Sequence, residues 1–332
     1  MIKHLIPVAA QAFDLSDVTD NAASFDMVVC AVSGESRALK VPGLIKASSG
    51  RKIAIRAQTQ DRPSPRASSV YERAGFEYFI YDESAFRRLL EACSAEGTTE
   101  GGNRGQESFR ILVDVSCLPR RIVASMFAAL ASQGLWSEVD LWLIYNPARY
   151  VPPASGSLEP NRRVAPVHPV FAGWISRAGL PVRTVVGLGY ERGKALGAVE
   201  YIQSSDYVLF IPESPEKRYR AKVEQHNRQL IRAASDAQVF DYDVLQPVET
   251  FQMLGGLVAG MKGQYKPVLL PFGPKILFAV SLLVALVHRE VSVWHVSGEE
   301  LEQPVERPGS SYFATIRVRL SAGRTNLNEV VV

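Results

Sequence analysis

Cysteine is scarce in this sequence, and so are long apolar runs and net charge of either sign. The three cysteines among 332 residues, Cys30, Cys93 and Cys117, have no histidine partners at metal-ligand spacing. A disulfide framework and a zinc site are therefore not expected, and the usage fits a reducing compartment. The most apolar stretch, residues 268–287, is interrupted by two prolines, a glycine and a lysine, and what remains is too short to span a bilayer. With a poor signal peptide at the start as well, we expect a cytoplasmic protein with no membrane and no metal site.

The charge balance limits the partners that the chain can have. A net charge of +3 is small for this length, so no extended nucleic-acid-binding surface is expected. The same net charge still allows a local basic pocket. Apolar residues make up 47% and charged residues 21%, the mix of an ordinary globular protein. A chain of 332 residues fits two domains better than one.

Short runs rich in Val, Ile and Leu alternate with helical patterns, which predicts parallel strands joined by crossover helices. The runs are nearly continuous, as in strands that are covered on both faces. We expect strands at 27–32, 52–56, 78–81, 110–115, 140–145, 183–188, 207–212, 239–242, 267–271 and 291–296. We expect helices at 84–93, 120–132, 193–202, 215–234, 247–261 and 275–287. An alternating run at 312–320 predicts an antiparallel edge strand, and the Gly-rich residues 95–108 predict a mobile loop.

Three segments of the first half recur in the second half in the same order, at offsets of 157, 155 and 152 residues. Any two doubly wound halves share periodicity, but periodicity does not account for a shared Pro-basic pair or a shared tryptophan. The matches are Ala38-Leu39 with Ala195-Leu196, Pro119-Arg120 with Pro274-Lys275, and Trp142 with Trp294. The expected fold class is therefore α/β, with two tandem Rossmann-like units, doubly wound and mostly parallel, related by internal duplication. We expect the first unit at 1–150, a connector at 151–180 and the second unit at 181–332.

The turn after the first strand of each half has small residues followed by a basic one. In open α/β sheets, ligands bind beyond the carboxyl ends of the strands, where helix N-termini attract anions. Arg37, Arg192 and Lys194 are suited to phosphate contacts. A tight structural turn with solvated charges is the alternative. The candidate ligand-binding residues here are Ser33 and Arg37 in the first half, and Gly187, Gly189, Glu191, Arg192 and Lys194 in the second.

The turn after the fourth strand repeats this composition. Ser116 and Arg120 lie there in the first half, and Gly273 and Lys275 in the second. A strand that ends in small or hydroxyl residues, followed by a basic residue on the first helical turn, builds an anion site. These four residues complete the set of candidate ligand-binding residues.

The second turn resembles the strand, small-residue turn, Lys and helix element of CRISPR-associated Rossmann fold (CARF) domains. In those domains the turn commonly reads N-x-T-G-G-T-K and lines a pocket for cyclic oligonucleotides. Gly273, Pro274 and Lys275 match this turn best, whereas Pro271 replaces its Asn and the first half has Cys-Leu-Pro instead of the glycines. Two such units in one chain are similar to the SAVED domain of bacterial anti-phage signalling proteins. The resemblance implies sensing of a cyclic or linear oligonucleotide, with a separate effector chain as partner because no effector domain is recognised in the sequence.

Rival functions remain open. A nucleotide-processing enzyme, such as a hydrolase, ring nuclease or nucleosidase, would use Glu35, Asp114, Glu191 or Glu213. An NAD(P)-binding protein would use the glycine turn of the second half, with Glu213 on a ribose. A scaffold that binds only a partner protein is the third alternative. We favour binding over catalysis and assign no catalytic residue and no cofactor; the segment 146–150 either contacts a base or forms an exit turn.

Overall fold

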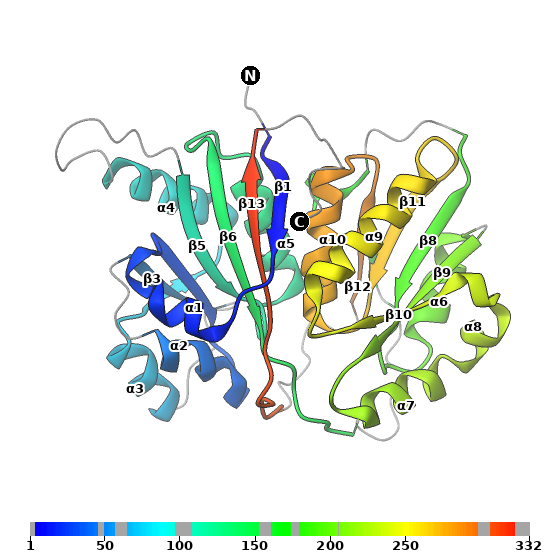
Figure 1. Cartoon of the computed structure of the whole chain (residues 1–332), viewed down its shortest axis with the longest axis horizontal. Coiled ribbons are helices and arrows are strands. Elements are labelled where there is room, and N and C mark those ends of the chain that lie inside the picture. Colours follow the sequence, from blue (N-terminus) through cyan, green and yellow to red (C-terminus); the bar gives the residue numbers. More distant parts are fainter. Residues whose placement is uncertain are drawn as a thin grey trace. The chain divides into compact units, whose positions relative to one another are not determined.

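The chain folds into two compact α/β units (Figure 1), and each is described by itself. The computed structural model describes residues 4–45, 50–56, 65–96, 108–152, 161, 163–173, 179–204, 206–297 and 306–322. The first unit comprises Met1–Pro147 together with Pro304–Val332, and the second comprises Ala148–Gln303. Among the described residues, no helix is both long and apolar enough to cross a membrane.

The first unit has a seven-stranded sheet with the order β1-β13-β6-β5-β2-β3-β4. Five neighbouring strands, from β6 to β4, are parallel, and β13 is antiparallel to both β6 and β1. The strands are β1 Ile6–Gln11, β2 Met27–Ala31, β3 Arg51–Arg56, β4 Glu77–Ile80, β5 Ser108–Asp114, β6 Glu138–Tyr145 and β13 Ala314–Ser321. The helices are α1 Leu15–Asp20, α2 Lys40–Leu44, α3 Pro65–Arg73, α4 Glu83–Glu96 and α5 Arg120–Ala131, with 3₁₀ turns η1 Ala22–Ser24 and η2 Ser36–Leu39.

The second unit has a six-stranded sheet with the order β10-β9-β8-β11-β12-β7. Its first five strands are parallel, and β7 is antiparallel to β12. The strands are β7 Arg163–Pro166, β8 Val182–Gly187, β9 Asp206–Glu213, β10 Val239–Asp243, β11 Lys266–Pro271 and β12 Ser292–Ser297. The helices are α6 Lys194–Ile202, α7 Lys217–His226, α8 Arg228–Ala233, α9 Pro247–Met261 and α10 Lys275–Val287, with 3₁₀ turns η3 Pro169–Phe171 and η4 Asp236–Gln238.

The parallel strands of both units follow one connection scheme. In each unit the first parallel strand lies in the middle, the next two lie on one side of it, and the last two lie on the other. The strand order therefore reverses between β2 and β5 and again between β8 and β11, with helices on both faces of each sheet (Figure 1). This is the doubly wound, Rossmann-like arrangement, and it confirms the α/β fold class predicted from the sequence.

The structure differs from the expected boundaries in the strand that completes each sheet. β13 was expected in the second unit as an edge strand, but it lies between β1 and β6 of the first sheet. β7 falls inside the expected connector 151–180, but it pairs with β12 of the second sheet. Each five-strand core is thus completed by the antiparallel strand that follows the other core in sequence. Which sheet β7 and β13 join is set by pairing with strands that are distant in the sequence. The alternating pattern of a single strand does not specify its partner.

The remaining elements were predicted in part. Helices α9 and α10 have the predicted bounds, whereas the single helix predicted at 215–234 is divided into α7 and α8 at Asn227. Strand β1 and helix α3 were not predicted. Most of the loop predicted at 95–108 lies outside the described residues.

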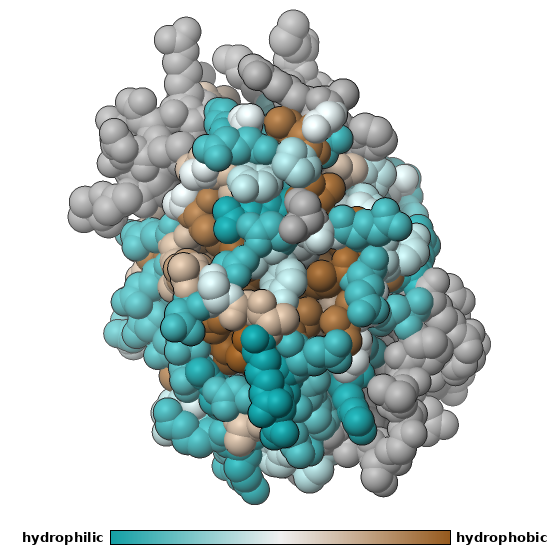
Figure 2. Space-filling model, turned by 90° about the vertical axis from the view of Figure 1, so that its right-hand side faces the viewer, coloured by the Kyte–Doolittle hydropathy of each residue, from teal (hydrophilic) through white to brown (hydrophobic). Residues whose placement is uncertain are grey.

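Each unit has its own apolar core. In the first, Trp142 packs against Phe13 and Phe25 with ring-centroid distances of 4.7 and 5.3 Å. In the second, Val186, Leu209 and Leu270 of adjacent strands form the centre of the core cluster. Figure 2 shows a face on which hydrophilic side chains cover most of the surface and apolar ones lie in separate groups. Trp142 is buried in the first core, and its repeat partner Trp294 packs half-buried against the second core.

Candidate functional site

In the second unit, the two glycine turns meet at the point where the strand order reverses. Pro271 of β11 pairs with Gly187 of β8, and the backbone N–H groups of Phe272 and Gly273 donate to Gly187 O at 2.9 and 3.3 Å. A Cβ on Gly273 would lie 2.6 Å from Leu188 O, so only glycine permits this approach of one turn to the other. The structure therefore brings together residues that lie far apart in the sequence.

A helix follows each of these adjacent strands after a short turn. Lys194 is the first residue of α6, after Gly193 at φ 76°, and Lys275 is the first residue of α10, after Pro274. Both lysine side chains are half-buried, whereas Arg192 is exposed. Since helix N-termini carry a partial positive charge and unpaired N–H groups, two of them with a lysine each make this edge attractive to anions.

The other candidate glycines serve packing. A Cβ on Gly187 would collide with Leu277 of α10 and lie 3.3 Å from the Cα of Pro271. A Cβ on Gly189 would collide with the Glu191 carboxylate. Gly187 thus lets α10 lie close against the sheet, and Gly189 makes room for an acidic side chain.

Glu191 and Glu213 differ in their contacts. The Glu191 atom Oε2 is buried and has no hydrogen-bond partner among the described residues. Glu213, at the end of β9, accepts from Arg220 Nη1 at 2.7 Å, and Arg220 also contacts Asp241 at 2.6 Å. Glu213 is therefore committed to an ion-pair network, while Glu191 keeps an oxygen for a ligand.

The turn after β8 is held by residues at the end of α7 that sequence reasoning missed. The Asn227 side chain, 4% exposed, donates to Gly189 O and to Val223 O, both at 2.8 Å. The His226 ring nitrogen Nδ1 hydrogen-bonds to Tyr190 O. These contacts divide the predicted long helix and fix the backbone of the turn; nothing in the local sequence distinguishes Asn227 from a polar surface residue.

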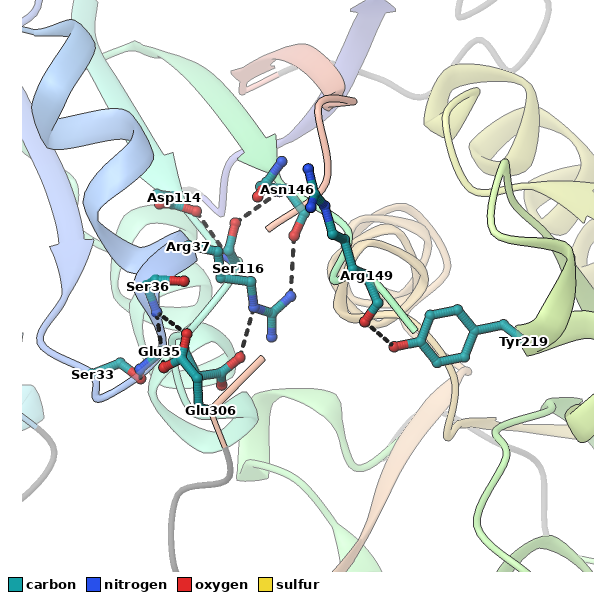
Figure 3. Close-up of polar contacts among 10 residues, drawn as sticks. All are labelled: Ser33, Glu35, Ser36, Arg37, Asp114, Ser116, Asn146, Arg149, Tyr219 and Glu306. Atoms are coloured by element: carbon teal, nitrogen blue, oxygen red, sulfur yellow. Dashed lines mark hydrogen bonds and ion pairs between the residues drawn. The ribbon is translucent and has the colours of Figure 1, made fainter. Parts of the chain in front are cut away.

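In the first unit, the equivalent turns are occupied by contacts within the chain (Figure 3). Arg37 was expected to contact phosphate, but its side chain is only 4% exposed, with Nε 2.7 Å from Glu35 Oε2 and Nη1 donating to Asn146 O at 3.0 Å. Glu35 N donates in turn to Ser33 Oγ at 3.2 Å. The Ser36 N–H donates to the Glu306 carboxylate at 3.0 Å, so an acidic side chain of the same unit already lies at the start of η2.

The second turn of the first unit is similarly engaged. Asp114, 2% exposed, accepts from Ser116 N at 2.9 Å, and Ser116 Oγ accepts from Asn146 N at 2.8 Å. The Asn146 side-chain amide donates to Tyr312 O at 2.6 Å, which ties the turn to the segment before β13. Arg120 is the first residue of α5, after Pro119, as Lys275 is of α10. Asp114 is thus a turn acid, and Ser116 is buried under Asn146.

Burial makes the Arg37–Glu35 pair important for the stability of the first unit. Burial alone lowers the pKa of Arg37, but Tyr145, Cys117 and Glu35 outweigh it and hold the pKa above its ordinary value. An arginine guanidinium is not deprotonated in proteins, so Arg37 stays charged when Glu35 is replaced. We expect Glu35→Gln to lower the free energy of unfolding by about 3 kcal/mol, because it leaves a buried cation without its counter-charge.

Urea denaturation of the full chain, with a probe in the first unit, measures this loss. The matched control is Glu138→Gln, because the Glu138–Arg319 pair of the same unit is 3.7 Å long and its side chains are 36% and 55% exposed. An exposed pair contributes at most about 1 kcal/mol. Equal losses in the two variants would show that the Arg37–Glu35 pair is not a special contact.

No protein-family model matches the chain, and no curated protein is significantly similar to it in sequence. Among the described residues, no group of three or more His, Cys, Asp or Glu side chains is placed to hold a metal ion.

Proposed function

We propose that the chain binds a phosphorylated nucleotide, in the form of a cyclic or linear oligonucleotide, at the carboxyl edge of its second sheet. The observation that carries this is the pair of helix N-termini, α6 and α10, that follow the adjacent central strands β8 and β11, each with a lysine as first residue. Phosphate groups are the biological anions that such helix ends bind most readily. Gly187 and Gly273 support the proposal because they bring the two turns into contact.

The proposal assigns different roles to the two units. In the first, Arg37 is paired with Glu35, and the Glu306 carboxylate lies on the Ser36 N–H, so the protein's own groups fill the anion positions. The second unit is then the binding unit and the first a structural one. In the bacterial defence setting that the CARF and SAVED resemblance implies, binding would signal to a separate effector chain in the cytoplasm.

The binding proposal is tested with the two helix-start lysines. We expect Lys194→Ala and Lys275→Ala each to weaken the binding of a fluorescent cyclic or linear tetra-adenylate by about tenfold, from the loss of one charge-assisted contact of about 1.5 kcal/mol. Fluorescence anisotropy measures the dissociation constants. Lys262→Ala, at the end of α9 and so at the opposite edge of the sheet, makes the same charge change and is expected to have no effect. Equal affinity in all four proteins would contradict the proposal.

A nucleotide hydrolase is the second candidate, and one observation favours it over the NAD(P)-binding rival. Of the four carboxylates considered for catalysis, Glu35, Asp114 and Glu213 are engaged within the chain, whereas Glu191 Oε2 is buried with no hydrogen-bond partner in the described part of the chain. The same engagement of Glu213 with Arg220 argues against a ribose contact by Glu213. Chromatography of a nucleotide incubated with wild type and Glu191→Gln separates the two candidates. If the chain is a binding protein, the nucleotide stays intact with both proteins. If it is a hydrolase, the wild type forms product and Glu191→Gln does not.

A further inference from the structure

Three tyrosines from distant parts of the sequence meet in the second unit. The ring centroids of Tyr150 and Tyr219 are 5.1 Å apart and those of Tyr190 and Tyr219 are 5.6 Å apart, with interplanar angles of 73° and 41°. All three residues are half-buried, so none of them is fully enclosed by the core. We call Tyr150, Tyr190 and Tyr219 the tyrosine cluster.

The cluster lies at the carboxyl edge of the second sheet. Tyr190 lies in the turn after β8, between Gly189 and Glu191 of the candidate site. Tyr219 lies in the first turn of α7, the helix that follows the neighbouring strand β9. The rings are therefore on the same edge as the turns assigned to phosphate.

Backbone contacts hold the cluster in place. The Tyr219 hydroxyl donates to Arg149 O at 3.1 Å (Figure 3), which fixes the segment that carries Tyr150. The carbonyl of Tyr190 is held by His226, and Tyr190 also packs against the core of the unit. Because Tyr150 and Tyr219 lie outside that core cluster, the apolar core does not account for their meeting.

Basic side chains surround the rings. The Arg218 guanidinium lies 5.1 Å from the Tyr150 ring centroid, and the side chains of Arg218 and Lys217 are 71% and 83% exposed. Their acidic partners are 3.6 Å away (Glu216) and 3.8 Å away (Glu213), and ion pairs this exposed are weak enough to be exchanged for a phosphate. Aromatic rings interleaved with cations are the combination with which proteins bind unpaired nucleobases and their backbone.

We propose that the tyrosine cluster stacks on a nucleobase of the ligand, with Arg218 and Lys217 over its sugar-phosphate chain. This inference rests on the proposed function and names the part of the ligand that the glycine turns do not contact. The ligand is then a nucleotide with an accessible base, and stacking accepts any base because every base presents a π-face.

The test uses a linear tetranucleotide that carries 2-aminopurine, whose fluorescence is quenched when the base stacks on an aromatic ring. We expect the wild-type chain to quench the probe on binding. Tyr219→Leu is expected to abolish the quenching and to weaken binding about 5- to 140-fold, the range for one stacked base. Tyr219→Phe keeps the ring and loses only the hydroxyl that donates to Arg149 O, so it is expected to retain the quenching that Tyr219→Leu loses, with affinity between those of wild type and Tyr219→Leu. Tyr201→Leu, which removes a 65% exposed tyrosine from α6 of the same unit, is the matched control and is expected to change nothing.

A second probe separates failure of the cluster from failure of the proposed function. An abasic tetranucleotide has the sugars and phosphates but no base, so wild type and Tyr219→Leu are expected to bind it equally. If Tyr219→Leu binds and quenches the 2-aminopurine probe as wild type does, the stacking role is wrong and the nucleotide site stands. If wild type binds neither probe, both are wrong. Should Tyr219→Leu fail to melt cooperatively, Tyr150→Leu takes its place with the same expected outcomes.

Discussion

Ending the chain at Gln303 is expected to unfold the first unit while the second unit keeps its fold. The removed segment contains β13, which lies between β1 and β6 with neighbours on both sides. Ile316, Val318 and Leu320 are each at most 1% exposed. Burial of three such side chains contributes roughly 5–9 kcal/mol, which is comparable with the roughly 5–15 kcal/mol that stabilises a whole domain.

Hydrogen exchange followed by mass spectrometry measures this outcome peptide by peptide. Peptides from β2, β5 and β6 are expected to lose their protection, and peptides from β8, β9 and β11 to keep it. A chain that ends at Ala322 retains β13 and is the control, with exchange as in the full chain. Continued protection of β5 and β6 in the shorter chain would contradict the conclusion that β13 is required to complete the first sheet.

Gly273→Ala and Gly256→Ala are expected to change stability in opposite directions, although each adds one methyl group. At Gly273 the new Cβ would lie 2.6 Å from Leu188 O and 3.3 Å from Tyr242 Oη, so the backbone of one turn must move. Such overpacking costs about 1–3 kcal/mol. At Gly256, in the middle of α9, no described residue beyond the adjoining helix backbone lies within 4 Å of the new Cβ, and alanine is the better helix former by about 1 kcal/mol.

Thermal unfolding of the two variants beside wild type measures the difference. The melting temperature of the second unit is expected to fall by roughly 2–12 °C in Gly273→Ala, from about 2–4 °C per kcal/mol, and to rise by a few degrees in Gly256→Ala. Gly273→Ala is also expected to weaken nucleotide binding, since the turns separate. A melting temperature that rises in both variants would mean that the close approach of the two turns is not required.

Local patterns specified most of the parallel core. The runs of Val, Ile and Leu located all ten central strands, and Pro247 and Pro274 marked the starts of α9 and α10. The shared Pro-basic pair correctly predicted that α5 and α10 begin alike, with Arg120 and Lys275 as first residues. Periodicity and helix-start residues are local properties of the chain, which is why the sequence alone reveals them.

The rest depends on contacts between distant residues. The basic side chain of Arg37, in a turn of small residues, predicted a phosphate contact. Its hydrogen-bond partner Asn146 lies 109 positions away in the sequence, so this buried contact becomes evident only in the folded chain. The partners of β7 and β13 are likewise set by sheet assembly. Of the residues that surround the candidate site, Tyr150 was noted as a base contact or part of an exit turn, whereas Tyr190, Tyr219 and Asn227 gave no local signal. Their place at the candidate site becomes evident only in the folded chain, where α7 lies beside the turn after β8.

Hydrogen exchange of the full chain, with and without a panel of linear and cyclic oligonucleotides, mononucleotides and NAD, tests the location of binding most directly. We expect at least one oligonucleotide to slow exchange at residues 187–196 and 272–278, because the two glycine turns and the first turns of α6 and α10 hold its phosphates. Exchange at residues 33–37 and 116–121 of the first unit is predicted to stay unchanged. Protection confined to the first unit, protection by NAD alone, or no protection by any member of the panel would contradict the account.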